Sequence, residues 1–116
     1  MTDSKTTVFH VSPPRSLGVV ERKARNLLAD DTVELDRVRI VVDDGETIAE
    51  FDRNESLAAA LASLPEIVEI AICRNALSGS PVDAVSEPER VEVVASGVGE
   101  LTRLQRAGAA YIRLCD

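Results

Sequence analysis

The sequence predicts a single α/β domain of three layers, with a mainly parallel sheet of about five strands and helices on both of its faces. Three observations support this fold class. Short apolar, β-branched segments alternate with amphipathic segments along the chain, which is typical of βαβ units. The 116 residues suit one domain, residues 1–116. The apolar fraction of 45% is sufficient for a core.

Five segments have the composition of strands, rich in Val, Ile, Thr and aromatic residues and bounded by turn residues. They are residues 6–11, 37–45, 67–73, 91–96 and 110–114. The second of them is almost continuously apolar before its Asp-Gly turn, as in a strand covered on both faces.

The segments between the strands predict helices. Residues 16–30 carry one apolar stripe behind Ser16, a candidate N-cap, and a short helix is expected within 46–51. Asn54 is expected to cap the next helix, and one or two turns are expected from Ser80. The last helix is expected to begin at Ser96 and end at Gly108. Its predicted inward residues are Val98, Leu101 and Leu104.

The composition argues against several classes of protein. A net charge of −7, no Trp and only three Phe and Tyr residues argue against direct nucleic-acid binding. No apolar run approaches the ~18 residues of a membrane span, and the first ten residues lack the apolar region of a signal peptide. We therefore expect an acidic cytoplasmic protein without a membrane segment, in which the two cysteines form no disulfide scaffold.

Polar residues follow the predicted strands where ligands bind in open parallel sheets, beyond the carboxyl ends. In chain order they are His10, Asp43 and Asp44, Cys73 and Asn75, and Ser96 and Gly97. The topology predicts that all of them lie at one edge of the sheet.

Cys73 is either a buried, inert thiol or a reactive nucleophile. A helical turn over residues 75–78 would favour its thiolate, and His10, the only histidine, could stabilise that thiolate or move a proton. Asp43 and Asp44 could bind a cation or act as acid and base, although a solvated turn is the simpler interpretation. If they lie close to Cys73, they disfavour its thiolate.

Three further features have open interpretations. Ser96, Gly97 and Gly99 precede a helix and could bind an anion, or could only form the turn from strand to helix. Cys115 is either part of a frayed terminus or a resolving thiol for Cys73. Neither CxxC nor HxxxH spacing occurs, so no metal site is expected.

Four stretches together resemble the DsrE/DsrF-like proteins over nearly the whole chain: VFHV, ARNLLAD, the segment from Cys73 to Leu77, and ASGVGELTRLQRAGAAYIRL. The resemblance implies a small parallel α/β subunit that assembles into homotrimers or hexamers and needs no cofactor. It also implies a sulfur relay, in which Cys73 accepts sulfane sulfur as a persulfide and transfers it from a donor protein to an acceptor protein.

Three hypotheses follow, and they leave open whether the chain is a sulfurtransferase. In the first, Cys73 is the sulfur-accepting nucleophile, Asn75 and the following amides stabilise its anion, and His10 assists. In the second, the protein is a non-catalytic module that binds a small anion or nucleotide through Ser96, Gly97 and Gly99. In the third, it is an assembly subunit whose partners carry the chemistry.

Overall fold

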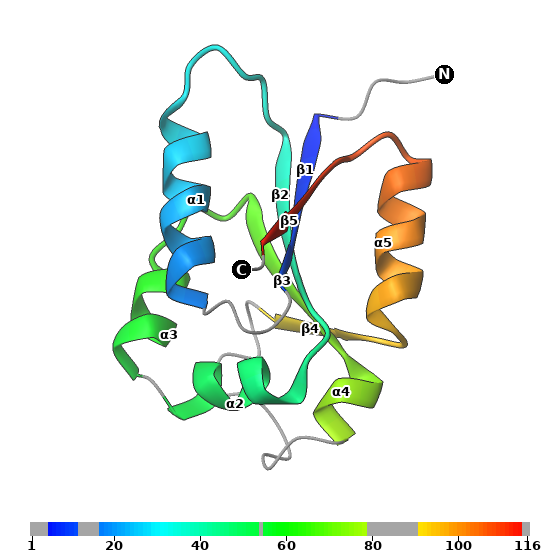
Figure 1. Cartoon of the computed structure of the whole chain (residues 1–116). Coiled ribbons are helices and arrows are strands. Elements are labelled where there is room, and N and C mark those ends of the chain that lie inside the picture. The colour runs from blue at the N-terminus through cyan, green and yellow to red at the C-terminus, as the bar shows by residue number, and fades with distance from the viewer. Residues whose placement is uncertain (1–4, 12–16, 54, 79–90, 115–116) are drawn as a thin grey trace.

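Five parallel strands form one sheet, as the sequence predicts (Figure 1). The computed structural model describes residues 5–11, 17–53, 55–78 and 91–114. The strands are β1 (Thr6–Val11), β2 (Arg37–Val42), β3 (Val68–Cys73), β4 (Val91–Val94) and β5 (Ala110–Leu114). Their order across the sheet is β4-β3-β2-β1-β5, so β4 and β5 are the edge strands.

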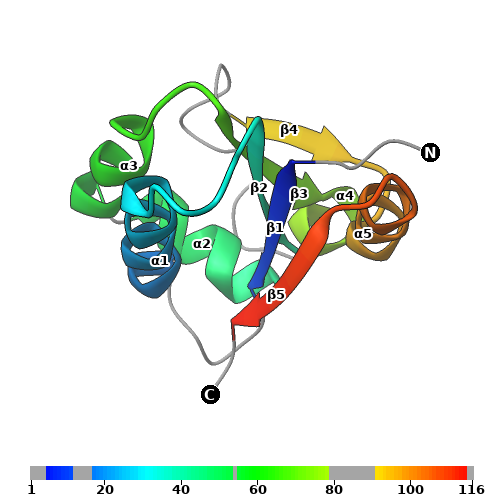
Figure 2. The same ribbon diagram turned by 90° about the horizontal axis from the view of Figure 1, so that it is seen from above.

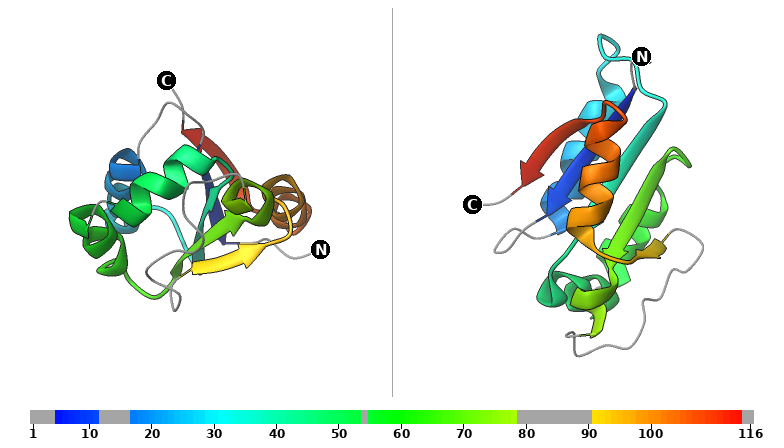
Figure 3. Two further views of the ribbon diagram at one scale, coloured as in Figure 1. Left: turned by 90° about the horizontal axis from the view of Figure 1, so that it is seen from below. Right: turned by 90° about the vertical axis from the view of Figure 1, so that its right-hand side faces the viewer.

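Helices cover both faces of the sheet and complete the three layers. They are α1 (Leu17–Ala29), α2 (Gly45–Arg53), α3 (Glu55–Ala62), α4 (Arg74–Ser78) and α5 (Gly97–Arg106). Figures 1 and 2 show α1, α2 and α3 on one face and α5 on the other. Since α2 and α4 follow β2 and β3 almost directly, they lie at the carboxyl ends of the strands, toward the viewer in the left-hand view of Figure 3.

The alternation of side chains along each strand divides the core into two clusters. On β2, Val38, Ile40 and Val42 pack with α1, α2 and α3, whereas Val41 packs against α5. All four are nearly inaccessible to solvent, which explains the long apolar run in this strand.

The structure corrects one expectation for α5. Val98 was expected to point inward, but it is 67% exposed. The buried residues of this helix are Gly97, Glu100, Leu101 and Leu104, spaced three or four apart on one stripe. A polar side chain, Glu100, therefore occupies the inward position that apolarity alone assigned to Val98.

Capping explains where two strands end. Asp44 Oδ2 accepts hydrogen bonds from the backbone N and Oγ1 of Thr47, at 2.9 and 3.0 Å, so α2 starts at Gly45 and β2 ends earlier than expected. Ser96, where the sequence places the start of the last helix, is the N-cap of α5. The predicted caps Ser16 and Asn54 and the expected turns from Ser80 lie outside the described residues.

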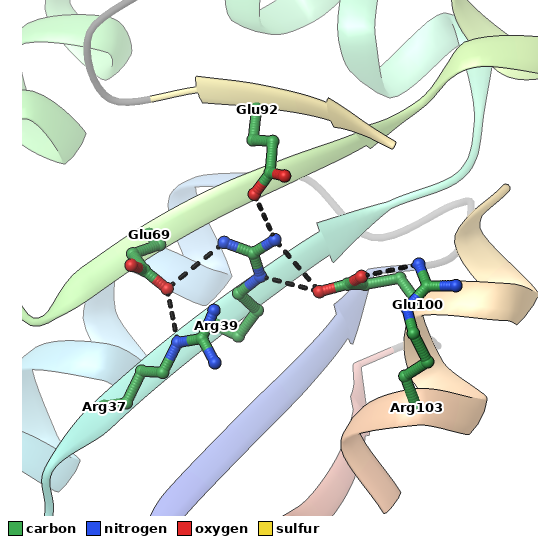
Figure 4. Close-up of polar contacts among 6 residues, drawn as sticks. All are labelled: Arg37, Arg39, Glu69, Glu92, Glu100 and Arg103. Atoms are coloured by element: carbon green, nitrogen blue, oxygen red, sulfur yellow. Dashed lines mark hydrogen bonds and ion pairs between the residues drawn. The ribbon is translucent and has the colours of Figure 1, made fainter. Parts of the chain in front are cut away.

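A buried arginine connects four elements on the α5 side of the sheet (Figure 4). Arg39, in β2, is 4% exposed. Its Nε donates to Oε2 of Glu100 in α5 at 2.9 Å. Its Nη1 donates to Oε1 of Glu69 in β3 at 3.1 Å, and its Nη2 donates to Oε1 of Glu92 in β4 at 2.6 Å. One side chain of β2 thus binds β3, β4 and α5.

Two further arginines complete this cluster. Arg37 Nε donates to the same oxygen of Glu69 at 2.5 Å, and Arg103 Nη2 donates to Oε1 of Glu100 at 2.9 Å. The six residues carry no net formal charge. Glu69 and Glu92 have side chains 41% and 63% exposed, so the buried part of the cluster is the pair of Arg39 and Glu100.

Both members of the buried pair stay ionised. Burial disfavours the charge on Arg39, but its hydrogen bonds to Glu92 and Glu100 and their negative charges hold the pKa of Arg39 above its ordinary value. Burial also opposes ionisation of Glu100. The hydrogen bond from Arg103 and the charge of Arg39 outweigh that effect, and the pKa of Glu100 lies below its ordinary value.

The substitution Arg39→Met should lower the free energy of unfolding by about 3–5 kcal/mol, because it leaves the buried Glu100 carboxylate without its buried partner. Arg37→Met is the matched control. The Arg37 side chain is 41% exposed, and its loss should cost less than about 1 kcal/mol. Urea unfolding at neutral pH measures both, and equal losses in the two variants would contradict this account.

The lowered pKa of Glu100 also predicts how stability depends on pH. Glu100 stabilises the fold above its ordinary pKa of 4.5, and this contribution is lost as the pH falls through the lower native value. At neutral pH the free energy of unfolding of the wild type should therefore exceed that of Glu100→Gln by about 1–3 kcal/mol. In acid the two values should converge. Denaturant unfolding across this pH range measures the difference, and a constant difference would be inconsistent with it.

Candidate functional site

The structure brings the polar residues that follow the strands to one edge of the sheet. His10 is the second-last residue of β1, Asp43 directly follows β2, and Cys73 is the last residue of β3. Ser96 and Gly97 follow β4 and begin α5. The left-hand view of Figure 3 looks onto this edge, with α2 and α4 in front.

His10 lies in a chain of hydrogen bonds that joins three neighbouring strands. Its Nε2 is 2.8 Å from Oδ2 of Asp43, which follows β2, and its Nδ1 is 2.7 Å from the hydroxyl of Tyr111 in β5. The side chains of His10 and Asp43 are 12% and 26% exposed, and Tyr111 is 39% exposed. The chain therefore runs from a partly buried carboxylate to a phenol in solvent.

The carboxylate determines which nitrogen of the neutral imidazole carries the proton. An ionised Asp43 can only accept hydrogen bonds, so Nε2 of His10 must donate to it. Nδ1 is then the acceptor and receives the proton of the Tyr111 hydroxyl. When His10 is protonated, Nδ1 donates instead, and the Tyr111 hydroxyl is free to donate to solvent.

This geometry changes two interpretations from the sequence. The solvated Asp-Asp-Gly turn is wrong, because Asp43 binds His10 and Asp44 caps α2. In the first hypothesis His10 assists Cys73, and in the structure both of its ring nitrogens bind other residues.

The start of α5 packs against Asp43. A Cβ atom on Gly97 would lie 2.8 Å from the Cβ of Asp43, which is closer than side chains tolerate. Gly97 is therefore required for the close approach of α5 to the end of β2. Ser96 Oγ accepts from the backbone N of Gly99 at 3.0 Å, so this hydroxyl and amide, predicted to bind an anion, are already paired with each other.

Cys73 is a free thiol with 7% exposure. Val42 and Ile72 form the last aligned pair of β2 and β3, and Asp43 and Cys73 are the residues that directly follow this pair. Cys73 belongs to neither apolar cluster. The thiol is thus mostly covered, but it lies at the polar edge of the sheet and not in the middle of the core.

The residues around Cys73 agree in part with the sequence expectations. The helical turn considered for residues 75–78 is present as α4, which begins at Arg74, and Asn75 is exposed in it. Cys115, the candidate resolving thiol, lies outside the described residues.

Tyr111 is the functional candidate that sequence reasoning missed. It is the only tyrosine of the chain. Its link to His10 spans 101 positions and depends on the pairing of β5 with β1, for which the sequence gives no local signal.

The described residues contain neither a candidate metal site nor a candidate membrane-spanning helix. Among residues 5–11, 17–53, 55–78 and 91–114, no three or more His, Cys, Asp or Glu side chains are grouped so that they could hold a metal ion. Within these same ranges, no helix has both the length and the apolar character needed to span a membrane.

The contact of Gly97 with Asp43 yields a prediction. Gly97→Ala should displace the Asp43 side chain, weaken its hydrogen bond to His10 and lower the free energy of unfolding by about 1–3 kcal/mol. Because His10 is the only histidine, its ring nitrogen shifts in NMR spectra report the change directly. Val98→Ala is the matched control, since Val98 is 67% exposed. Unchanged histidine shifts in Gly97→Ala would refute the contact.

Comparison with solved structures finds a relative of similar length. No family model matches the chain, and no curated protein does. Among solved structures, a protein of unknown function from Methanobacterium thermoautotrophicum matches with a TM-score of 0.71 and 32% sequence identity, over 94% of this chain and 98% of that one. The shared fold and identity extend over nearly the full length of both proteins. The chain therefore belongs to the same family as this Methanobacterium protein.

Proposed function

We propose that the protein is a sulfur carrier in which Cys73 accepts sulfane sulfur as a persulfide and passes it to a partner protein. The observation that carries this proposal is the position of a free thiol as the last residue of β3, at the carboxyl edge of a parallel sheet. The resemblance of the segment from Cys73 to Leu77 to DsrE/DsrF-like proteins supports the same role.

The proposed reaction requires no cofactor and no net oxidation. The Cys73 thiolate attacks the outer sulfur of a donor persulfide, a new S–S bond forms at Cys73, and the donor S–S bond breaks. The electron pair of the broken bond remains on the donor sulfur, which leaves as a thiolate. An acceptor thiolate then attacks the outer sulfur of the Cys73 persulfide and restores the Cys73 thiolate.

The surroundings of Cys73 restrict the donor. Cys73 is only 7% exposed, so we expect a small donor to reach it more readily than a bulky one. Asp43, which follows the adjacent strand β2, forms a hydrogen bond with His10, and these two side chains are a neutral pair when His10 is protonated.

Several parts of the proposal stay predictions. Stabilisation of the Cys73 anion by Asn75 and the amides after it is expected from the helical turn that follows Cys73. Assembly into homotrimers or hexamers and separate sulfur-donor and sulfur-acceptor proteins are expected from the resemblance. The alternative, anion or nucleotide binding through Ser96, Gly97 and Gly99, has less support, because the Ser96 hydroxyl and the Gly99 amide bind each other.

Incubation with inorganic polysulfide should add one sulfur atom to Cys73, detected by intact-mass spectrometry and located by peptide mapping. Because Cys73 is mostly covered, the rate with polysulfide divided by the rate with a bulky maleimide should be higher for the folded chain than for the unfolded chain. The matched controls are Cys73→Ser and Cys115→Ser, each with one remaining thiol.

Sulfur uptake should persist in Cys115→Ser and disappear in Cys73→Ser. A Cys73→Ser protein that takes up sulfur as well as the wild type would refute the proposal, as would a folded Cys115→Ser protein that takes up none.

A further inference from the structure

The Tyr111 phenol has a base behind it and solvent in front of it. Its hydroxyl lies 2.7 Å from Nδ1 of His10, and Nε2 of His10 lies 2.8 Å from a carboxylate oxygen of Asp43. The rings of Tyr111 and His10 are 5.8 Å apart between centroids and tilted by 47°. The sulfur-carrier proposal uses none of these contacts.

We infer that Tyr111, His10 and Asp43 form an acid–base relay that exchanges protons with a small, weakly acidic molecule bound at the exposed phenol. Tyr111 is the residue that touches this ligand. His10 receives or supplies the proton through Tyr111, and Asp43 positions His10 and stabilises its charged form. In hydrolytic triads a hydroxyl group is activated by an imidazole, which is in turn oriented by a carboxylate. Tyr111, His10 and Asp43 follow the same order.

The proton movement balances within the three residues. A ligand X–H gives its proton to the Tyr111 oxygen as the Tyr111 O–H bond breaks and its proton moves to Nδ1 of His10. The products are X⁻, an intact phenol and an imidazolium paired with the Asp43 carboxylate. The reverse sequence returns the proton from Nδ1 through the phenol, so the relay acts as acid or base according to the state of His10.

The charged groups around the relay favour an anionic product. The register pairs His10 with Arg113 and Val8 with Tyr111, so Arg113 and Tyr111 lie on the same face of β5. Arg113 is exposed there, and a guanidinium attracts the conjugate base X⁻.

Among the residues that the structure describes, Asp43, Cys73 and the cluster around Arg39 are further titratable groups on this face. Arg39 pairs with Val8, two residues before His10, and the positive charge of Arg39 is balanced by Glu69, Glu92 and Glu100. The cluster therefore supplies little net field at the relay.

These features define the class of ligand. The exposed phenol accommodates a small molecule, the relay requires an O–H or S–H group that ionises near neutral pH, and Arg113 favours a ligand that becomes an oxyanion or a thiolate. An enol or a thiol has this chemistry.

Benzenesulfonyl fluoride tests the relay, because it captures a phenol whose proton a neighbouring base accepts. The phenol oxygen forms the O–S bond, fluoride leaves, and the phenol proton moves to His10. Tyr111 is the only tyrosine and His10 the only histidine, so peptide mapping assigns the label and NMR follows His10 in the same sample. Measuring labelling in a Cys73→Ser chain makes the result independent of the sulfur-carrier proposal.

We expect labelling of Tyr111 in the folded chain to be at least about tenfold faster than in the urea-unfolded chain, the lower end of what a positioned base supplies. The rate should rise as NMR shows His10 losing its proton and then reach a plateau. His10→Gln should remove the advantage of the folded chain. Asp43→Asn should lower the rate while leaving Tyr111 exposed, and Tyr111→Phe should take up no label at this position.

Two results would overturn the inference. One is an equal rate for His10→Gln and the parent chain. The other is a rate that climbs steadily into the alkaline range without a plateau, as expected when the phenolate alone reacts. Should His10→Gln fail to fold, the pH profile of the parent chain and the rate of Asp43→Asn decide the question.

Discussion

The buried guanidinium of Arg39 is the interaction on which the α5 side of the protein depends. Arg39 is 4% exposed. Removing its charge from water costs several kcal/mol, and ion pairs and hydrogen bonds must compensate for that cost. Glutamates from β3, β4 and α5 provide that pairing. Arg39 thus binds α5 to the sheet through Glu100, in the first turn of the helix, and the start of the same helix packs Gly97 against Asp43. The charge cluster and the candidate site are therefore coupled through the position of one helix end.

The order of the strands determines which side chains can meet. Because β5 returns to pair with β1, Tyr111 reaches His10, and because β2 pairs with the other side of β1, Asp43 reaches the opposite nitrogen of the same ring. Cys73 lies one strand further along the sheet. Each of these side chains comes from a different strand or from the residue after it, so the constellation exists only when the whole sheet is formed.

The sequence predicted the fold well and the candidate site only in part, for identifiable physical reasons. Strand composition and helical periodicity located all five strands and the helices α1, α2, α3 and α5, because burial of apolar side chains dominates those segments. The same rule assigned Val98 to the interior, since it does not anticipate that a charged residue such as Glu100 is buried when an arginine from β2 pairs with it. Strand ends gave His10 and Cys73 as candidates. Tyr111 was missed because its importance depends on a pairing between the first and last strands, which no local pattern encodes.

The distance between the two proposed reactive groups limits how they could serve one reaction. Persulfide transfer needs an acceptor in the thiolate form, and a thiol is a weak acid of the class inferred for Tyr111. Tyr111 and Cys73 lie on β5 and β3, which are three strand spacings apart in the sheet. At about 4.8 Å per spacing, the two strands are roughly 14 Å apart. The register places Tyr111 level with Glu69, and Cys73 lies four residues further along β3, so the separation of the two backbones is larger still. A small thiol cannot span that separation, so it would meet the relay and Cys73 in separate events. A single reaction that used both groups would therefore need an acceptor large enough to reach from Tyr111, near the start of β5, to Cys73, at the end of β3.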